Sequence, residues 1–408
     1  MAGSRRSSRA LAAICVFVVA LGAWNVVRFP PGNGFDALEH MAYADGLVPG
    51  GHLPHGTGEY YTPPGYYAVA GSADWLAKQA GLGEPHRAGM VLNVLFLLDT
   101  VILVWLIARE LWPGRERLAL GAAAFTALVP VTVKADAMFH PEPMSLFLCT
   151  LALWLCVRTF ADRRYAIALG VALGAAQLVR AFTLWTVAAV AIALLAARRW
   201  RELAIVLVLA AAIPAPWYVH QRLTYGGSPV FNRPTVSKPL YERRPLRFYV
   251  DPGVPDVVTK PYRPHFLNLA LPTTYTELWG DYFGIWAWNG LGHPSAHVRH
   301  RLELQSVVGI LPTLLAVAGW LMLLLASLRS PPRLAVALLP LLGIVGYLYF
   351  TVSYPTHDGD VLKATYMLST TAGWALGFGY LLERVRGRAV LALLGLCALA
   401  ELPFLVYG

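Results

Sequence analysis

The sequence has few charged residues. Only 14% of its 408 residues are Asp, Glu, Lys or Arg, whereas an ordinary soluble domain has about 25%. Hydrophobic residues make up 57% of the chain, and the mean hydropathy is +0.53. This composition excludes a soluble globular protein, and it excludes a disordered chain because so much apolar surface has to be buried. The class that remains is a bundle of membrane-spanning helices.

Cysteine is also scarce, and its placement is uninformative for redox chemistry. The four cysteines all lie within apolar runs, at Cys15, Cys149, Cys156 and Cys397. Neither a disulfide framework nor the paired spacing of a zinc site can be built from them.

Long apolar runs are abundant. A helix that crosses a hydrocarbon core of about 30 Å needs roughly 17 to 25 residues. Apolar stretches of about this length lie at 10–27, 88–108, 118–134, 144–160, 165–179, 182–198, 203–221, 305–328, 334–353, 364–383 and 389–407. We therefore predict an all-α integral membrane protein with about eleven transmembrane helices. We expect residues 1–408 to form one polytopic domain, in which the long outer connections 28–87 and 222–304 carry interfacial helices and part of the active site.

The basic residues indicate the orientation of these helices. Of the 33 Lys and Arg residues, seventeen lie on the side of the N-terminus and sixteen on the other side, ten of them within residues 222–304. Because a connection that long does not count toward the positive-inside rule, the comparison is seventeen against six. The N-terminus is predicted to be cytoplasmic. Residues 1–27 are alternatively a secretory signal, and the later helices keep the same orientation in either case.

The first outer connection opens with several polar residues at helical spacing. Asp36, Glu39, His40 and Tyr43 follow one another at i, i+3, i+4 and i+7, so they share one face if this piece is helical. A carboxylate beside an imidazole suits general-base chemistry, with the neighbour orienting the base. The same groups suit a divalent cation. A solvated face on a surface helix is the third interpretation.

The order of motifs in this connection resembles a known superfamily. The motifs are Asp36, His40 and Tyr43, then Gly51-His52-Leu53-Pro54, then Tyr61-Thr62-Pro63-Pro64-Gly65-Tyr66-Tyr67. This series is similar to the first outer loop of the glycosyltransferase-C superfamily, in its bacterial branch similar to protein mannosyltransferases. Those members are integral-membrane enzymes that use polyprenyl-phosphate sugars. The resemblance covers about the first 230 residues.

The resemblance implies roles for two acids. In that superfamily the acid in the first outer loop is the catalytic base, which corresponds to Asp36. Glu142 matches a position where members often carry an acid that assists catalysis or binds a cation, although a carboxylate at a helix N-terminus is also stabilised by the helix dipole. His40 completes the predicted catalytic set. Members often have a second acid directly beside the first, but Ala37 stands there in this sequence, so Glu39 is assigned to substrate binding instead of a paired-carboxylate role. Tyr43 is also assigned to substrate binding.

A basic residue is expected at the donor phosphate. Members often carry an Arg-Tyr pair at the start of a late helix, where the cation meets the lipid phosphate, and Lys363 and Tyr366 stand at that place here. A lysine neutralises a phosphate as a point charge. Snorkelling of Lys363 to the interface is the alternative, and Arg180 is then the second candidate cation. His357, in the turn before Lys363, is a further candidate for substrate binding.

Together these residues predict a membrane glycosyltransferase, either a hexosyl- or a pentosyltransferase. It moves a sugar from a polyprenyl-phosphate donor to an acceptor hydroxyl of a lipid, glycan or protein. The reaction is a single inverting displacement at the outer face of the plasma membrane. No obligatory cofactor is expected, although a divalent cation is possible, and nucleic acid is not a partner.

A transporter or flippase of a lipid-linked or small polar substrate is the alternative function. Transporters tend to have internal repeats and polar residues near the bilayer midplane. This sequence has no recognisable repeat, and its polar clusters lie at the predicted outer ends of helices. Both observations favour the enzyme.

Overall fold

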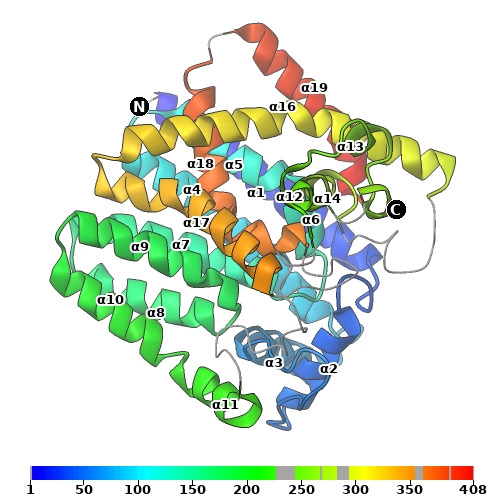
Figure 1. Cartoon of the computed structure of the whole chain (residues 1–408), viewed down its shortest axis with the longest axis vertical. Coiled ribbons are helices and arrows are strands. Elements are labelled where there is room, and N and C mark those ends of the chain that lie inside the picture. The colour runs from blue at the N-terminus through cyan, green and yellow to red at the C-terminus, as the bar shows by residue number, and fades with distance from the viewer. Residues whose placement is uncertain are drawn as a thin grey trace.

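The computed structural model describes residues 2–226, 244–266, 269–282, 294–353, 362–385 and 387–407. Across these residues the chain is helical, with no strand. Figure 1 shows most of the long helices running side by side, with α16 (Ala296–Ser327) along one side of the bundle. The predicted all-α class is confirmed.

Six of the described helices are long and apolar enough to cross a membrane. They are α1 (Ala2–Arg28), α4 (Arg87–Leu111), α7 (Glu142–Ala161), α16, α17 (Pro331–Ser353) and α19 (Arg388–Leu405). Two bent pairs would raise the number to eight. Two further apolar helices are shorter, α8 (Tyr165–Gln177) and α9 (Leu184–Ala196), the latter preceded by the 3-10 turn η1 (Ala181–Thr183). Every predicted apolar stretch coincides with helix, but the number of eleven spans stays a prediction.

Two of the predicted spans are not single straight helices. Residues 118–134 divide into α5 (Glu116–Leu128) and α6 (Pro130–Asp136), bent by 57°, and residues 203–221 into α10 (Trp200–Ala212) and α11 (Ala215–Tyr225), bent by 45°. A proline stands at each break, Pro130 and Pro214. Because proline lacks an N–H and clashes with the preceding turn, it interrupts the helical hydrogen bonds. The prediction of continuous helices at these two places is wrong.

Small residues allow the later helices to pack closely. Residues 364–383 begin as the 3-10 helix η4 (Ala364–Thr370) and continue as α18 (Thr371–Leu382), which packs against α5 and α16. A Cβ atom at Gly319 of α16 would lie only 2.1 Å from the carbonyl oxygen of Gly377. Such close backbone approach is typical of helix contacts in membranes, where dispersion contacts drive association.

Both long connections contain helices at one end of the bundle. The first holds α2 (Ala37–Leu47) and α3 (Gly65–Gln79). The second holds α12 (Leu246–Val250), α13 (Asp256–Thr259), the 3-10 turn η3 (Arg263–Phe266) and α14 (Ala270–Trp279). Figure 1 places α12, α13 and α14 near the C-terminus and α2 and α3 at the lower edge of the molecule, with both groups away from the N-terminus. The described fold thus collects the polar connections at the end that the sequence predicts to be outside.

Candidate functional site

Asp36 stands just before α2 in an unusual backbone conformation. Its φ and ψ are 51° and 23°, in the left-handed region, and its side chain makes no capping hydrogen bond with the helix. Short polar side chains such as Asp tolerate this region better than other non-glycine residues do. Helix α2 therefore begins at Ala37, and the carboxylate is free to point away from the helix end.

The four polar residues of this segment do not share one face. Asp36 precedes the helix, Glu39 is exposed, and His40 and Tyr43 are buried. The prediction of a common face is wrong because it required the helix to include Asp36. Glu39 instead lies against Gly58, whose added Cβ would be 3.7 Å from the Cβ of Glu39.

Lys363 forms an ion pair with Asp36 from the far end of the chain. Its Nζ donates to Asp36 Oδ2 at 2.9 Å, and the Asp36 side chain is 40% exposed. The ammonium also lies 4.7 Å from the ring centroid of Phe35 and 5.7 Å from that of Tyr366. Burial raises the pKa of Asp36, but the charge and hydrogen bond of Lys363, with His140 and Arg180 behind it, lower the pKa below its ordinary value. Asp36 is therefore an ionised carboxylate.

His40 is a buried, neutral imidazole. Its Nδ1 lies 2.7 Å from the hydroxyl of Tyr67, and its ring meets that of His140 edge-on at 4.6 Å between centroids. Its Nε2 is buried with no hydrogen-bond partner among the described residues. Burial, and then the nearby charges of His140, Arg180 and Lys363, hold the pKa of His40 well below its usual range. One ring nitrogen is thus available to a ligand or a substrate.

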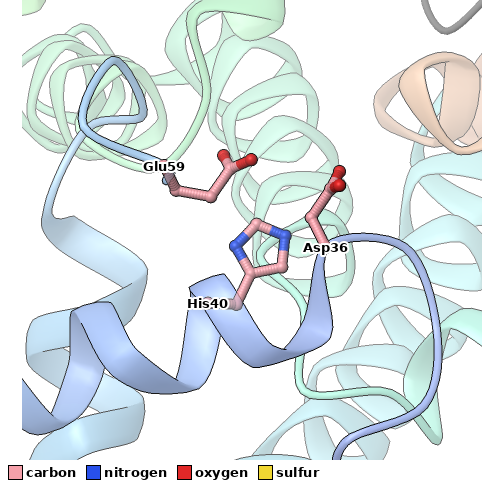
Figure 2. Close-up of side chains that lie close together, drawn as sticks. All are labelled: Asp36, His40 and Glu59. Carbon is pink, nitrogen blue, oxygen red and sulfur yellow. The ribbon is translucent and has the colours of Figure 1, made fainter. Parts of the chain in front are cut away.

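Glu59 joins the site, although its role was not predicted. Its Oε1 accepts a hydrogen bond from the Tyr61 hydroxyl at 3.0 Å, and its Oε2 accepts one from the Thr62 hydroxyl at 2.5 Å. Ligand atoms of Asp36, His40 and Glu59 all lie within 4.8 Å of one another. Figure 2 shows the His40 ring between the two carboxylates. In the sequence, the available signal is a single acid at the start of an aromatic segment.

Behind this group, Arg180 forms a buried network with two carboxylates. Its Nη2 lies 2.8 Å from Glu142 Oε1, and its Nη1 lies 3.7 Å from Glu59 Oε2. Nη1 also donates to the Thr62 hydroxyl at 3.1 Å, and Glu142 pairs in addition with His140. Burial lowers the pKa of Arg180, but the charges of Glu142 and Glu59 outweigh it and raise the pKa above the ordinary value. Arg180 is therefore charged, and both of its terminal nitrogens have partners, whereas its buried Nε has none among the described residues.

This chain is similar to a known protein family and to several solved structures. Residues 74–220 match the family described as dolichyl-phosphate-mannose-protein mannosyltransferase. The crystal structure of an oligosaccharyltransferase from Archaeoglobus fulgidus, in complex with Zn and sulfate, matches with a TM-score of 0.53 and 15% identity. That match covers 97% of this chain and 52% of the other. The resemblance to the glycosyltransferase-C superfamily is confirmed.

Two further structures matched by this glycosyltransferase-C-like chain carry bound lipid phosphates. The archaeal oligosaccharyltransferase AglB of A. fulgidus, with an inhibitory peptide and a dolichol-phosphate, matches at 14% identity and a TM-score of 0.53, over 97% of this chain and 55% of that chain. ArnT from Cupriavidus metallidurans, bound to undecaprenyl phosphate, matches at 17% identity and a TM-score of 0.43, over 92% and 76%. This chain spans about half the length of the oligosaccharyltransferases. No curated protein matches the sequence significantly.

The remaining predicted residues contribute mainly packing where the structure describes them. Tyr43 stacks on Tyr67 with 3.9 Å between ring centroids, and its hydroxyl donates to the carbonyl oxygen of Thr62. Tyr366 is half-buried and packs 4.6 Å from the ring centroid of Phe182. His357 lies outside the described residues.

The groups of this site suit acid-base chemistry or the binding of a charged ligand. It combines one exposed carboxylate, a neutral imidazole and two cations at one end of the bundle. Carboxylate and imidazole ligands suit several divalent metals, so Asp36, His40 and Glu59 have the right donor atoms. Both oxygens of Glu59 already accept hydrogen bonds, however, and Lys363 already neutralises Asp36. A metal would therefore have to displace existing partners.

Proposed function

We propose that this protein is a membrane glycosyltransferase that moves a sugar from a polyprenyl-phosphate donor to an acceptor hydroxyl. The observation that carries the proposal is the pair of an ionised, accessible Asp36 and a cationic Lys363, 2.9 Å apart. A base for the acceptor and a cation for the donor phosphate are the two groups that this transfer needs. The mannosyltransferase family match and the dolichol-phosphate named in the AglB structure support the same class of donor.

Asp36 is the general base of the proposed reaction. Its carboxylate removes the proton of the acceptor hydroxyl while the acceptor oxygen attacks the anomeric carbon. The bond from that carbon to the phosphate oxygen breaks, the polyprenyl phosphate leaves, and the proton stays on Asp36. A single displacement of this kind inverts the anomeric configuration. His40, neutral and with a free Nε2 beside Asp36, orients the hydroxyl.

Lys363 links donor binding to the strength of this base. In the absence of donor its ammonium keeps the pKa of Asp36 low, which makes the carboxylate a weak base. A donor phosphate offers Lys363 a second anion to neutralise. As the ammonium moves toward the phosphate, the Asp36 carboxylate regains basicity and the leaving group gains stabilisation. The base is then strongest when the donor is bound.

Glu142 and Arg180 support the site from behind. Their ion pair is buried, and Arg180 has a second carboxylate and a hydroxyl as partners. The backbone N–H of Gly65 also donates to the carbonyl oxygen of Leu178 at 2.7 Å, so this hairpin is joined to the first connection. These contacts favour a positioning role for Glu142 and Arg180 over direct contact with the donor.

A divalent cation is compatible with the site but not required by the proposed reaction. Asp36, His40 and Glu59 would hold it, and it would supply additional positive charge for a phosphate oxygen. Lys363 already supplies a positive charge at that place. We propose that the reaction proceeds without an obligatory ion, at the outer face of the plasma membrane.

Transfer by purified protein tests this proposal. The protein in lipid nanodiscs is supplied with a panel of polyprenyl-phosphate hexoses and pentoses and with membrane extract as acceptor. We expect release of polyprenyl phosphate and a product of inverted anomeric configuration. A retained configuration contradicts the single displacement. Movement of an intact lipid-linked sugar across proteoliposomes, without cleavage, supports the flippase alternative.

A further inference from the structure

A buried ion pair in the second connection lies next to Lys363. Arg263 of η3 and Glu277 of α14 pair through Nη2 and Oε1, and each side chain is only 1% exposed. Neither residue lies within the segment that matches the mannosyltransferase family. Neither touches Asp36 in any described contact, so their role has to be sought in what else they hold.

Both members of the pair hold the main chain on either side of Lys363. Arg263 Nη2 donates to the carbonyl oxygen of Leu362. Glu277 Oε2 accepts a hydrogen bond from the backbone N–H of Ala364 at 2.8 Å. The residues immediately before and after Lys363 are therefore fixed to the same ion pair.

Packing makes this attachment rigid. Leu362 is fully buried in a cluster with Phe248, Ala270 and Tyr347. The hydroxyls of Thr274 and Tyr347 lie 3.1 Å apart, which joins α14 to α17. Helix α14 also packs against η4, the element that Lys363 precedes. The backbone of Lys363 is thus held by directed hydrogen bonds inside an apolar cluster.

Stability alone does not account for such a pair. Two buried charges lose their hydration, and apolar residues of similar volume are often equally stabilising or better. An apolar pair cannot accept a hydrogen bond from one backbone amide and donate another to a carbonyl group two residues away. Charged hydrogen-bonding partners have a fixed direction and so set the position of the segment that they hold.

We propose that Arg263 and Glu277 are positioning residues that set the ammonium of Lys363 between Asp36 and the donor phosphate. This inference rests on the proposed function of Lys363. It assigns the second long connection a part in the site, through the backbone of residues 362–364 and without any contact to the reactants.

A double-mutant cycle tests the inference. Glu277→Gln, Lys363→Met and the double variant are compared in nanodiscs, with undecaprenyl phosphate as the binding probe and donor turnover as the second measurement. Because a small displacement of a catalytic group is costly, we expect Glu277→Gln to weaken binding of the probe about tenfold. The effect should disappear in the Lys363→Met background, since residues that act through one another are not additive.

Each alternative result would contradict either this inference alone or the proposed phosphate contact of Lys363 as well. Independent losses that multiply in the double variant would assign Glu277 a general structural role and overturn the inference. Unchanged binding in Glu277→Gln, with a loss in Lys363→Met, would overturn the inference and leave the proposed function intact. Unchanged binding in Lys363→Met would overturn the phosphate contact itself, and this inference with it.

Two further variants guard against misfolding and unspecific effects. Arg263→Lys keeps the charge but has a shorter side chain, so its ammonium does not reach the position from which Arg263 Nη2 donates to both Glu277 and Leu362. It should weaken binding in the same direction if Glu277→Gln does not fold. Glu401→Gln is the matched control, because Glu401 is a buried acid that accepts from Gln305 at 3.2 Å. We expect its binding of undecaprenyl phosphate to equal that of the unaltered protein. An equal loss in Glu401→Gln would overturn the specific role of Glu277.

Discussion

Two cations of the site differ in what surrounds them. Lys363 pairs with Asp36, whose side chain is 40% exposed, whereas Arg180 pairs with Glu142 and Glu59, whose side chains are each 2% exposed. Arg180 also donates to Thr62, so each of its two terminal nitrogens faces at least one buried acceptor. The Lys363 side chain is itself only 5% exposed, so its ion pair is open to solvent and ligands through Asp36.

The difference indicates that the two cations have different roles. A buried cation with two buried carboxylates cannot exchange a partner without leaving a charge unpaired in an apolar environment. In the other pair the Asp36 carboxylate is 40% exposed and can be hydrated when Lys363 turns to another anion, so this pair exchanges partners at a lower cost. Arg180 therefore fixes the architecture, and Lys363 is the cation that can respond to a donor.

Replacement of Asp36 by Asn should have the largest effect on activity. The variant keeps the volume and tolerates the left-handed backbone, but it lacks the base, so turnover should fall by about 10² to 10⁴. The measurement is donor consumption by purified protein, with binding of undecaprenyl phosphate measured in parallel. Asp45→Asn, on the exposed surface of α2, is the control that keeps its activity. Normal turnover of Asp36→Asn would exclude Asp36 as the base.

Arg180→Met should reduce stability more than any change at Lys363. It leaves Glu142 and Glu59 buried without their common cation, which costs about 3 to 5 kcal/mol in comparable cases. Unfolding in denaturant, followed in detergent, measures the loss. A second change, Glu142→Gln, removes one of the orphaned charges and should restore part of the stability. Equal stability of Arg180→Met and the unaltered protein would contradict the buried network.

Lys363→Met should weaken donor binding and reduce stability less than Arg180→Met, because the Asp36 carboxylate that it leaves unpaired is 40% exposed. Loss of the ammonium should raise the Kd for undecaprenyl phosphate by about tenfold to a hundredfold, since charge-assisted hydrogen bonds contribute about 1.5 to 3 kcal/mol. Lys363→Arg should retain part of the affinity. If Arg180→Met weakens binding and Lys363→Met does not, the phosphate contact belongs to Arg180, and the roles proposed above for the two cations are reversed.

The pH dependence should change in a predictable direction. Against the raising effect of burial, Lys363 lowers the pKa of Asp36, so the base stays ionised as the pH falls toward and below its ordinary range. In Lys363→Met the pKa of Asp36 rises, and activity should be lost at a higher pH during acidification. The acid limb of kcat/KM against pH measures this shift. An unchanged limb would mean that another group controls it.

Chelation should have the smallest effect. Because Lys363 already neutralises Asp36, we expect activity to remain within about twofold after treatment with a chelator and dialysis. The comparison is made with the untreated protein at the same ionic strength. Loss of activity that manganese or magnesium restores would instead assign an ion to Asp36, His40 and Glu59.

Hydropathy predicts much of the fold because each span has to be apolar over its whole length. It places helices at all the predicted stretches, but it does not register a lost hydrogen bond, so the bends at Pro130 and Pro214 were missed. The start of α2 was misplaced for a similar reason. Periodicity assigns faces to residues within a helix, and it cannot detect that Asp36 turns into the left-handed region.

The candidate site was predictable in part. The ordered motifs pointed to Asp36, His40, Glu142 and Arg180, and a basic residue before a late helix pointed to Lys363; the structure brings these together. Glu59 was not predicted, because a single acid beside aromatic residues has no distinctive spacing. The Arg263 and Glu277 pair has no sequence signature, because its partners are backbone groups 87 and 99 residues away.

The pairing of Asp36 with Lys363 also sets a time order for the appearance of the site. The two residues are 327 positions apart, and synthesis at about 5 to 20 residues per second separates them by roughly 15 to 65 seconds. During that interval Asp36 has been made and its cation has not. A partly synthesised chain can therefore contain the whole first connection and still lack the proposed donor site, so the proposed sugar transfer would require η4 and Lys363 to be in place.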